Sequence, residues 1–201
     1  MKAPNVELEN TIRQKALELL MEKEPEEIGM REIARACGVT PPTIYYYFRD
    51  KDQLFARVKQ DCLAVLDETM ENAIENGGTP VHSIRSGFTA FRDWAFENQR
   101  VAILIMGRFK ADIDDIESML RRNYRSFSLA VELVEKSVLS GHLSCADPVL
   151  AVSLCVYSLW GVVESVLSKR THPCFWDRGL ELTDASIQMC MDYLGWKGDS
   201  V

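Results

Sequence analysis

The segment that most constrains the fold is MREIARACGVTPPTIYYYFRDKDQLF, which runs from Met30 to Phe55 and predicts two short helices joined by a tight turn. Gly38 lies where the first helix must end with a positive φ, a conformation that costs glycine little. Thr40 is placed to cap the second helix, and Pro41 follows at its first position, where a missing N–H is no loss. This helix–turn–helix arrangement is the unit that lays its second helix in the major groove of DNA.

Apolar spacing decides which side of the second helix is buried. Ile44 and Phe48 lie four positions apart, so they are expected to face the core of the domain. The intervening side chains then point mostly outward, where they can reach bases or phosphates, although Tyr45 could instead pack in the core and Lys51 could be an ordinary solvated charge. Basic side chains near helix starts are placed for phosphates. The predicted DNA contacts are Arg31, Thr40, Pro41, Thr43, Tyr45, Tyr46, Tyr47 and Lys51.

The charge distribution agrees with a nucleic-acid partner even though the whole chain carries a net charge of −7. Residues 30–59 hold six basic and three acidic side chains, whereas residues 61–201 hold thirteen basic and twenty acidic ones. The positive balance is therefore confined to the segment with the two-helix motif, and the remainder would be repelled by DNA.

These residues resemble the TetR family of one-component transcriptional regulators. The matching pattern comprises Ile33-Ala34, Gly38-Val39-Thr40, Thr43-Ile44-Tyr45, Phe48, Lys51 and Leu54-Phe55. The resemblance implies a homodimer on double-stranded DNA, most often a repressor of a near-palindromic operator, which a small and often apolar effector releases. The family's contact positions fall on Arg31, Thr43, Tyr45, Tyr46, Tyr47 and Lys51. Pro41 departs from the family pattern, because proline lacks the donor often found there, so bases must be read at this position by shape or methyl contact.

The remaining chain predicts helices and no strand pattern longer than a few residues. We therefore predict an all-α fold of about nine helices. It comprises an N-terminal three-helix DNA-binding domain with the helix-turn-helix (1–50), a connecting helix (51–76) and a larger helical domain for effector binding and dimerisation (77–201). Asp50 and Gln53 are spaced to cap the connecting helix, which would be ~39 Å long and would link the two domains mechanically. Further helices are expected over 5–24, from Thr79-Pro80, over 100–109 and 112–140, from Asp147-Pro148, and from a cap at Thr183-Asp184.

The helix expected from Pro148 to Lys169 is apolar nearly all round, so both of its sides must be covered. One side can face its own domain, and the other is expected to face a second copy of the chain. Full burial inside a monomer is the alternative. The TetR resemblance also implies dimerisation through the last two long helices. The predicted interface residues are Val156, Leu159, Val163, Val166, Leu167, Ile187, Met191 and Leu194.

Aromatic and thioether side chains of the larger domain are candidates for lining an effector site, although an aromatic stripe at helical spacing is more often core. The family resemblance favours a cavity among them. The candidates are Phe88, Phe91, Trp94, Met106, Tyr124, Phe127, Tyr157 and Trp160. Few charges fall on these faces, so we expect an apolar or aromatic ligand with one or two polar anchors.

No sequence pattern indicates catalysis, a metal site or a cofactor. His142 with Cys145, and His172 with Cys174, supply two ligands each where a structural zinc needs four. The six cysteines are scattered without a CxxC pair, no apolar leader is present, and the longest mostly apolar run is shorter than a membrane span. A cytoplasmic protein without a membrane partner is expected. The alternatives are a thiol-based, redox-responsive regulator and an all-α small-molecule-binding protein that does not use its motif on DNA.

Overall fold

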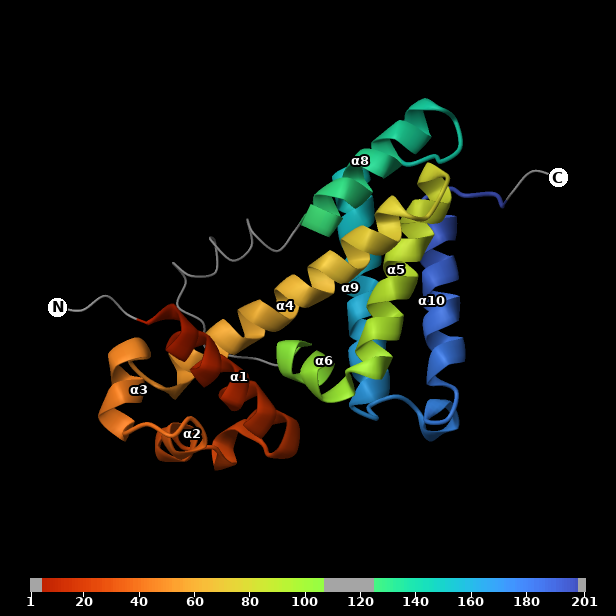
Figure 1. Ribbon diagram of the computed structural model, residues 1–201. Helices are drawn as coiled ribbons and strands as arrows, with labels where there is room; N and C mark the ends of the chain where they lie inside the picture. The colour runs from red at the N-terminus through yellow and green to blue at the C-terminus, as the bar shows by residue number, and fades with distance from the viewer. Residues whose placement is uncertain (1–4, 107–124, 199–201) are drawn as a thin grey trace. The chain divides into compact units, whose positions relative to one another are not determined.

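The computed structural model describes residues 5–106 and 125–198 (Figure 1). Every regular element in these two ranges is helical, which confirms the predicted all-α class. The α-helices are α1 (Val6–Glu22), α2 (Met30–Ala36), α3 (Pro41–Tyr47), α4 (Lys51–Glu75), α5 (Pro80–Glu97), α6 (Gln99–Met106), α8 (Arg125–Leu139), α9 (Pro148–Leu167) and α10 (Gly179–Tyr193). Short 3-10 turns cover Pro25–Glu27 and Pro173–Phe175.

The chain divides into two compact units, and the division falls inside α4, between Leu63 and Ala64. The described part of the first unit is residues 5–63, and that of the second is residues 64–106 and 125–198. The helix predicted over 51–76 is continuous from Lys51 to Glu75, so it contributes its first part to one unit and its last part to the other.

The turn between α2 and α3 has the predicted glycine geometry. Gly38 has a φ of +68°, and the N–H of Val39 donates to the carbonyl of Ala34 over 3.0 Å. These features satisfy the last carbonyls of α2 and reverse the chain within a few residues. Thr40 is the N-cap residue of α3 with an extended backbone, but its hydroxyl lies 2.9 Å from the Thr43 hydroxyl and caps no backbone N–H.

The first unit is held together by side chains that the helical periodicity places inside. Ile12 of α1, Ile33 of α2 and Ile44 of α3 are each 0% exposed. Burying a side chain of this size contributes about 1.5–3 kcal/mol. The same core takes in the start of α4, where Leu54 is 0% exposed and Phe55 is 2% exposed.

The start of α4 is fixed by two side chains from the predicted capping pair. The Asp50 carboxylate accepts the backbone N–H of Gln53 over 2.8 Å, as a capping residue does. The Gln53 amide oxygen accepts the backbone N–H of Arg49 over 2.7 Å, one residue earlier than a capping box requires. The Gln53 N–H, together with the Arg49 guanidinium, lowers the pKa of Asp50 below its ordinary value.

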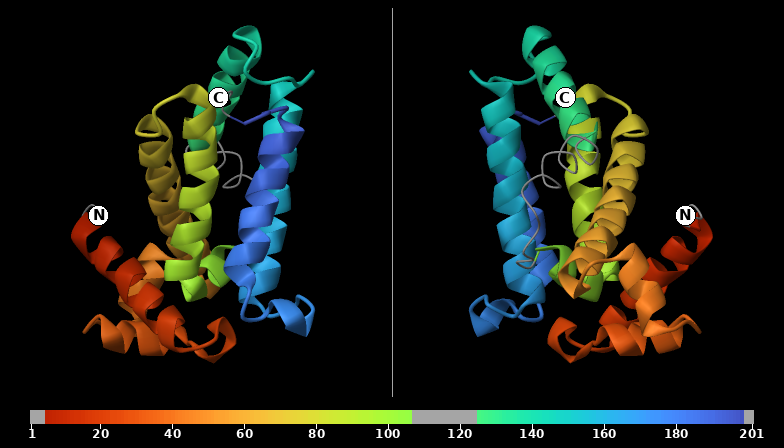
Figure 2. Two further views of the ribbon diagram at one scale, coloured as in Figure 1. Left: turned by 90° about the vertical axis from the view of Figure 1, so that its right-hand side faces the viewer. Right: turned by 90° about the vertical axis from the view of Figure 1, so that its left-hand side faces the viewer.

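The second unit is a helical bundle in which α9 and α10 run side by side (Figure 2). α5 packs against α8, α9 and α10, and α6 packs against α5 and α9. At Gly87 of α5 the neighbouring helix approaches closely, because an added Cβ would lie 2.7 Å from the Ile74 side chain of α4. The predicted caps at Thr79 and Asp147 are both present, and each accepts the N–H three residues later, from His82 and from Leu150.

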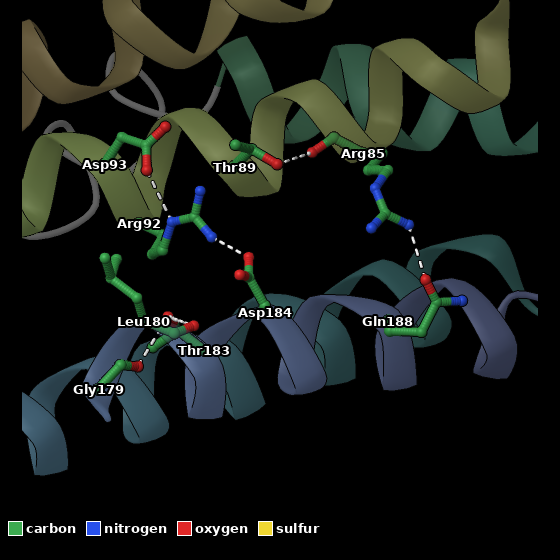
Figure 3. A network of polar contacts seen from close by, with 9 residues as sticks. All are labelled: Arg85, Thr89, Arg92, Asp93, Gly179, Leu180, Thr183, Asp184 and Gln188. Carbon is green, nitrogen blue, oxygen red and sulfur yellow. Dashed lines mark hydrogen bonds and ion pairs between the residues drawn. The ribbon is translucent and has the colours of Figure 1, made fainter. Parts of the chain in front are cut away.

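Within the second unit, α10 and α8 are described over residues that differ from the predicted ranges. α10 begins at Gly179, four residues before the predicted cap at Thr183, so that prediction was wrong. Thr183 is 0% exposed, and its hydroxyl donates to the carbonyls of Gly179 and Leu180 within the helix (Figure 3). The helix predicted over 112–140 is described from Arg125 onward, and residues 112–124 lie outside the described residues.

Candidate functional site

The outward side of α3 presents two large aromatic side chains to solvent. Tyr45 is 53% exposed and Tyr46 is 52% exposed, whereas Ile44 and Phe48 on the opposite side are buried. The alternative of core packing for Tyr45 is therefore excluded. Two exposed phenol groups on one helix face offer ring edges for base contacts and hydroxyls for base or phosphate oxygens.

Tyr47 and Lys51 have partners within their own unit that the sequence did not reveal. The Tyr47 hydroxyl accepts the backbone N–H of Asn5, the N-cap residue of α1, over 3.1 Å. The Lys51 ammonium donates to the carbonyl of Pro25 over 2.9 Å and lies 5.8 Å from the centre of the Phe55 ring. Both side chains are half-buried, so both help to fix α3 and α4 within the unit, in addition to any part they take in binding.

The other predicted contact residues lie at the edges of the same surface. Arg31 and Thr40 are exposed, and Pro41 and Thr43 are half-buried. The hydrogen bond between the Thr40 and Thr43 hydroxyls fixes the orientation of both groups at the start of α3. This start therefore presents oriented hydroxyls beside a proline ring, followed one turn later by the two exposed tyrosines.

The predicted effector residues divide between the core of the second unit and its surface. Phe88, Phe91 and Trp94 are buried on one face of α5. Trp160 of α9 stacks on Phe91 with the ring centres 5.6 Å apart and the planes at 12°. Met106 and Phe127 are half-buried, and Tyr124 lies outside the described residues.

Tyr157 does not belong with this aromatic group, because its side chain is 67% exposed. It lies on the side of α9 that faces away from the core, so its assignment to an effector site was wrong. An aromatic residue on a helix that is apolar nearly all round gives no sequence signal for the direction in which it points.

A polar network joins α5 to α10, and sequence reasoning missed it (Figure 3). Arg85 donates to the Gln188 amide oxygen over 2.8 Å, and Arg92 pairs with Asp93 and Asp184. The polar residues of α5 that form this edge follow helical spacing, at positions 85, 89 and 92, which is the signal that could have located it. These contacts hold α5, which carries Phe88 and Phe91, against α10.

Most of the predicted dimer residues are already used in the protomer's own core. Leu159, Val163, Ile187, Met191 and Leu194 are each 0–1% exposed, so their assignment to an interface with a second copy was wrong. They face inward because α9 and α10 pack on each other and on α5. Val156, Val166 and Leu167 are half-buried.

The apolar surface that remains on α9 and α10 consists of other residues. On α9, three exposed residues share one side with Gly161, where an added Cβ would meet nothing within 4 Å. On α10, two exposed residues lie four positions apart. We name these exposed residues of two neighbouring helices the α9–α10 apolar face; they are Leu150, Leu154, Tyr157, Gly161, Met189 and Tyr193.

Within residues 5–106 and 125–198, no three His, Cys, Asp or Glu side chains are grouped as they would be to hold a metal ion. α9 is long and apolar enough to cross a membrane by length and composition, contrary to the estimate from the apolar run alone. Five of its residues are nevertheless buried within the protomer, where α5, α6, α8 and α10 all pack against it.

Comparison with known proteins agrees with this geometry. Residues 12–58 match the sequence pattern of bacterial regulatory proteins of the tetR family. The HTH-type transcriptional regulator EthR of Mycolicibacterium smegmatis is 30% identical over 77 residues, which span 38% of this chain and 36% of that protein. The matched part of the chain therefore covers little more than a third of this curated relative.

Solved structures share the fold over nearly the whole chain. FadR from Bacillus subtilis in complex with stearoyl-CoA has a TM-score of 0.70 at 16% identity, over 92% of this chain and 98% of that one. RolR in complex with resorcinol has a TM-score of 0.63 at 16% identity, over 94% and 93% of the two chains. The motif and the sequence match agree that residues 12–58 are similar to bacterial regulatory proteins of the tetR family, and the chain shares its fold with these solved structures.

Proposed function

We propose that the protein is a homodimeric, ligand-responsive transcriptional regulator, acting as a repressor of a palindromic operator. The observation that carries the DNA-binding half is the surface of α3. Tyr45 and Tyr46 project from a helix whose other side is locked into the core by Ile44 and Phe48. A rigid helix with exposed polar aromatic tips is suited to the major groove, because its side chains reach base edges without ordering a loop.

On the operator, the side chains of α3 divide into those that read bases and those that position the helix. Tyr45, Tyr46 and Thr43 are proposed to contact bases or phosphates, while Arg31 contacts a phosphate at the edge. The ring of Pro41 offers only apolar contact, which fits a thymine methyl group better than a polar base edge. Tyr47 and Lys51 hold the helix in place and add contacts to the backbone of the DNA.

We propose that a second copy of the chain covers the α9–α10 apolar face. Large exposed apolar side chains arranged along two adjacent helices are typical of a protein–protein interface. In a twofold dimer each protomer would place α3 in one major groove, with the two grooves ~34–36 Å apart along the DNA. α9 packs against four helices of its own chain, which favours a second protomer over lipid as the partner of its exposed side. We therefore propose that the protein is cytoplasmic.

The effector is proposed to bind in the second unit, among the aromatic residues of α5 and α9. The ligands named for two structural neighbours, stearoyl-CoA and resorcinol, support an effector with an apolar or aromatic part. Ser137 and Ser186 have buried hydroxyls that find no hydrogen-bond partner among the described residues, so they are candidate polar anchors. Binding would lower DNA affinity by a coupling free energy of about 1–3 kcal/mol, transmitted along α4.

Selection of bound DNA from a random pool tests the proposal. At ~150 mM salt, where bare electrostatic attraction is weak, we expect enrichment of a near-palindromic sequence. Tyr46→Ala should then weaken binding to that sequence roughly tenfold or more, since losing a good base contact costs about 1–3 kcal/mol. Val65→Ala removes an exposed apolar side chain of α4 and serves as the control that leaves binding unchanged.

The dimer is tested by the molar mass of two matched variants in light scattering. Tyr157→Glu places a charge in the α9–α10 apolar face and should yield monomers, whereas Val65→Glu places the same charge on exposed α4 and should leave dimers intact. If no DNA sequence is enriched from well-folded dimers, with or without small-molecule extract, the motif is not used on DNA and the proposal fails.

A further inference from the structure

The connection between α9 and α10 brings a thiol and an imidazole together. The Nδ1 atom of His172 lies 3.1 Å from the Sγ atom of Cys174, and both side chains are exposed to solvent. The same Nδ1 atom lies 3.3 Å from the backbone nitrogen of Cys174, whose N–H points at it. This pair is separate from the α3 surface and from the aromatic group of the second unit.

The contact with the backbone N–H of Cys174 determines which atom donates in the contact between His172 and the thiol. A backbone N–H can only donate, so Nδ1 of His172 must accept and its ring proton must be on Nε2. Nδ1 has a single lone pair, which the Cys174 S–H group shares with this N–H, with the Sγ atom 3.1 Å from Nδ1. A nucleophile with a base in hydrogen-bond reach is the arrangement used to activate a side chain for attack.

The turn that carries the pair is ordered by further contacts. The N–H of Phe175 donates to the carbonyl of His172 over 2.9 Å, and the indole N–H of Trp176 donates to the carbonyl of Thr171 over 3.2 Å. The guanidinium of Arg178 lies 5.4 Å from the centre of the Phe175 ring. The thiol is thus held in one place on the surface, and no chain movement is needed to bring the base to it.

The other five cysteines lack this combination of access and a base. Cys62, Cys155 and Cys190 are buried. Cys37 and Cys145 are half-buried, and burial raises the pKa of both thiols. Reactivity of a thiol depends on access and on loss of its proton, so these five are expected to react slowly.

We propose that Cys174 is a covalent modification site for soft carbon electrophiles, of the class of α,β-unsaturated carbonyl compounds. The Sγ atom forms a bond to the β-carbon while the thiol proton passes to Nδ1 of His172. The electron pair of the C=C bond moves toward the carbonyl oxygen, and the proton then returns from the imidazolium to the α-carbon. The product is a thioether that contains every atom of both reactants, so no oxidant or reductant takes part.

The probe for this site is N-ethylmaleimide, itself an α,β-unsaturated carbonyl compound, applied briefly to the full-length native chain near neutral pH. Mass spectrometry of the digested protein gives the extent of labelling at each cysteine. We expect Cys174 to be labelled at least tenfold faster than Cys37 or Cys145. His172→Ala should slow the labelling of Cys174 by at least tenfold, since general-base assistance contributes about 10²–10⁴ in rate when fully used.

Two variants separate base assistance from other effects. His172→Gln keeps a hydrogen-bond acceptor but supplies no base, so it should be as slow as His172→Ala. His142→Ala is the matched control, because the ring of His142 contacts the Ser140 hydroxyl at 2.8 Å and its loss should leave Cys145 and Cys174 labelling unchanged. In denaturant all six thiols should react with N-ethylmaleimide at similar rates. The faster labelling of Cys174 in the native protein would then be due to the fold.

Labelling of Cys174 no faster than Cys37 and Cys145 would overturn the proposal, and so would an unchanged Cys174 rate in His172→Ala. The experiment needs no DNA and no effector, so neither outcome depends on the proposed regulatory function. If exposure alone made Cys174 reactive, N-ethylmaleimide would label Cys174 at the native rate in both His172 variants. If His172 acts as a base, labelling of Cys174 should be slow in both variants.

Discussion

The carboxylate of Asp67 on α4 binds the first turn of α8 through Ser126. Oδ1 accepts the backbone N–H of Ser126 over 3.1 Å and also the Ser126 hydroxyl, and Oδ2 accepts the N–H of Arg125 over 3.2 Å. The first N–H groups of a helix have no partner within it, and the positive end of the helix dipole favours a carboxylate there. A residue of α4 thereby caps α8, which is 58 positions further along the chain.

The first prediction concerns this cap. Asp67→Asn should destabilise the second unit by about 1–2 kcal/mol, because one carboxylate oxygen becomes an amide group that cannot accept the Arg125 N–H. The change would be measured as a shift of the urea midpoint followed by circular dichroism. Glu68→Gln alters an exposed carboxylate one position away on α4 and should change stability by less than about 0.5 kcal/mol. Equal effects of the two substitutions would contradict the assigned cap.

Sequence reasoning succeeded where the determining interactions are local. The glycine at position 38, the cap at Asp147 and the buried positions of α3 depend on neighbours within one turn. It failed where a partner is distant along the chain. The bonds from Tyr47 to Asn5 and from Lys51 to Pro25 span 42 and 26 positions, and no periodic pattern records them.

The choice of residues for the dimer interface failed for a different physical reason. On α9, apolar residues occur nearly all round, so composition indicates that both sides are covered but not which residues face a second copy. Only packing on α10 and α5 shows that Leu159 and Val163 face inward and Leu154 and Tyr157 outward. The predicted start of α10 was wrong because threonine is a residue type favoured at helix caps. In the structure the Thr183 hydroxyl instead donates to the Gly179 carbonyl within the helix.

The second prediction concerns Lys169, which has a φ of +52° at the end of α9. Its N–H donates to the carbonyl of Val166, and the N–H of Arg170 donates to the carbonyl of Ser165 over 2.8 Å. This is the termination seen at Gly38, with lysine in the left-handed position where glycine carries no strain. Lys169→Gly should therefore raise the free energy of unfolding by about 0.5–1 kcal/mol.

The matched control for Lys169→Gly is the same substitution at Lys136, an exposed residue in the last turn of α8 with helical backbone. Lys136→Gly should lower stability by about 1 kcal/mol, because glycine is a poor helix former. The two substitutions should thus shift the urea midpoint in opposite directions. A loss of stability in Lys169→Gly would contradict the account.

The third prediction concerns the pH dependence of stability. Burial, and to a lesser extent the nearby Asp61 charge, raises the pKa of Cys62 from 9.0 to about 11. The folded state therefore keeps a proton that the unfolded state loses first. The corresponding stability is fully present below about pH 9 and is lost as the pH rises to about 11, a loss of about 2–3 kcal/mol at 1.36 kcal/mol per unit.

The measurement for Cys62 compares urea unfolding of the native chain and Cys62→Ala between about pH 8 and pH 11. Other groups titrate equally in both proteins, so the stability difference between them should narrow by about 2–3 kcal/mol over this interval. Cys174→Ala, which removes an exposed thiol, provides the comparison for a cysteine outside the core. A constant difference for Cys62→Ala across the interval would show that the buried thiol does not titrate as described.

The fourth prediction concerns the Arg92–Asp184 pair between α5 and α10 (Figure 3). The Arg92 side chain is 11% exposed, whereas Asp184 is 65% exposed. Removing Asp184 therefore leaves a nearly buried charge without one of its partners, whereas removing Arg92 would leave a charge that water can solvate. Asp184→Ala leaves a nearly buried guanidinium with Asp93 as its remaining carboxylate, and we expect a loss of about 1–2 kcal/mol. An exposed ion pair contributes about 0–1 kcal/mol.

Glu181→Ala, one turn earlier on α10, supplies the comparison for Asp184→Ala. Glu181 pairs with Arg178, and both of those side chains are more than half exposed, so its loss should cost less than about 0.5 kcal/mol. Both substitutions remove a carboxylate near the start of the same helix, so the helix dipole affects them alike. A larger loss for Asp184→Ala, measured by urea unfolding, would therefore reflect the buried guanidinium on α5, and equal losses would mean that Arg92 does not depend on α10.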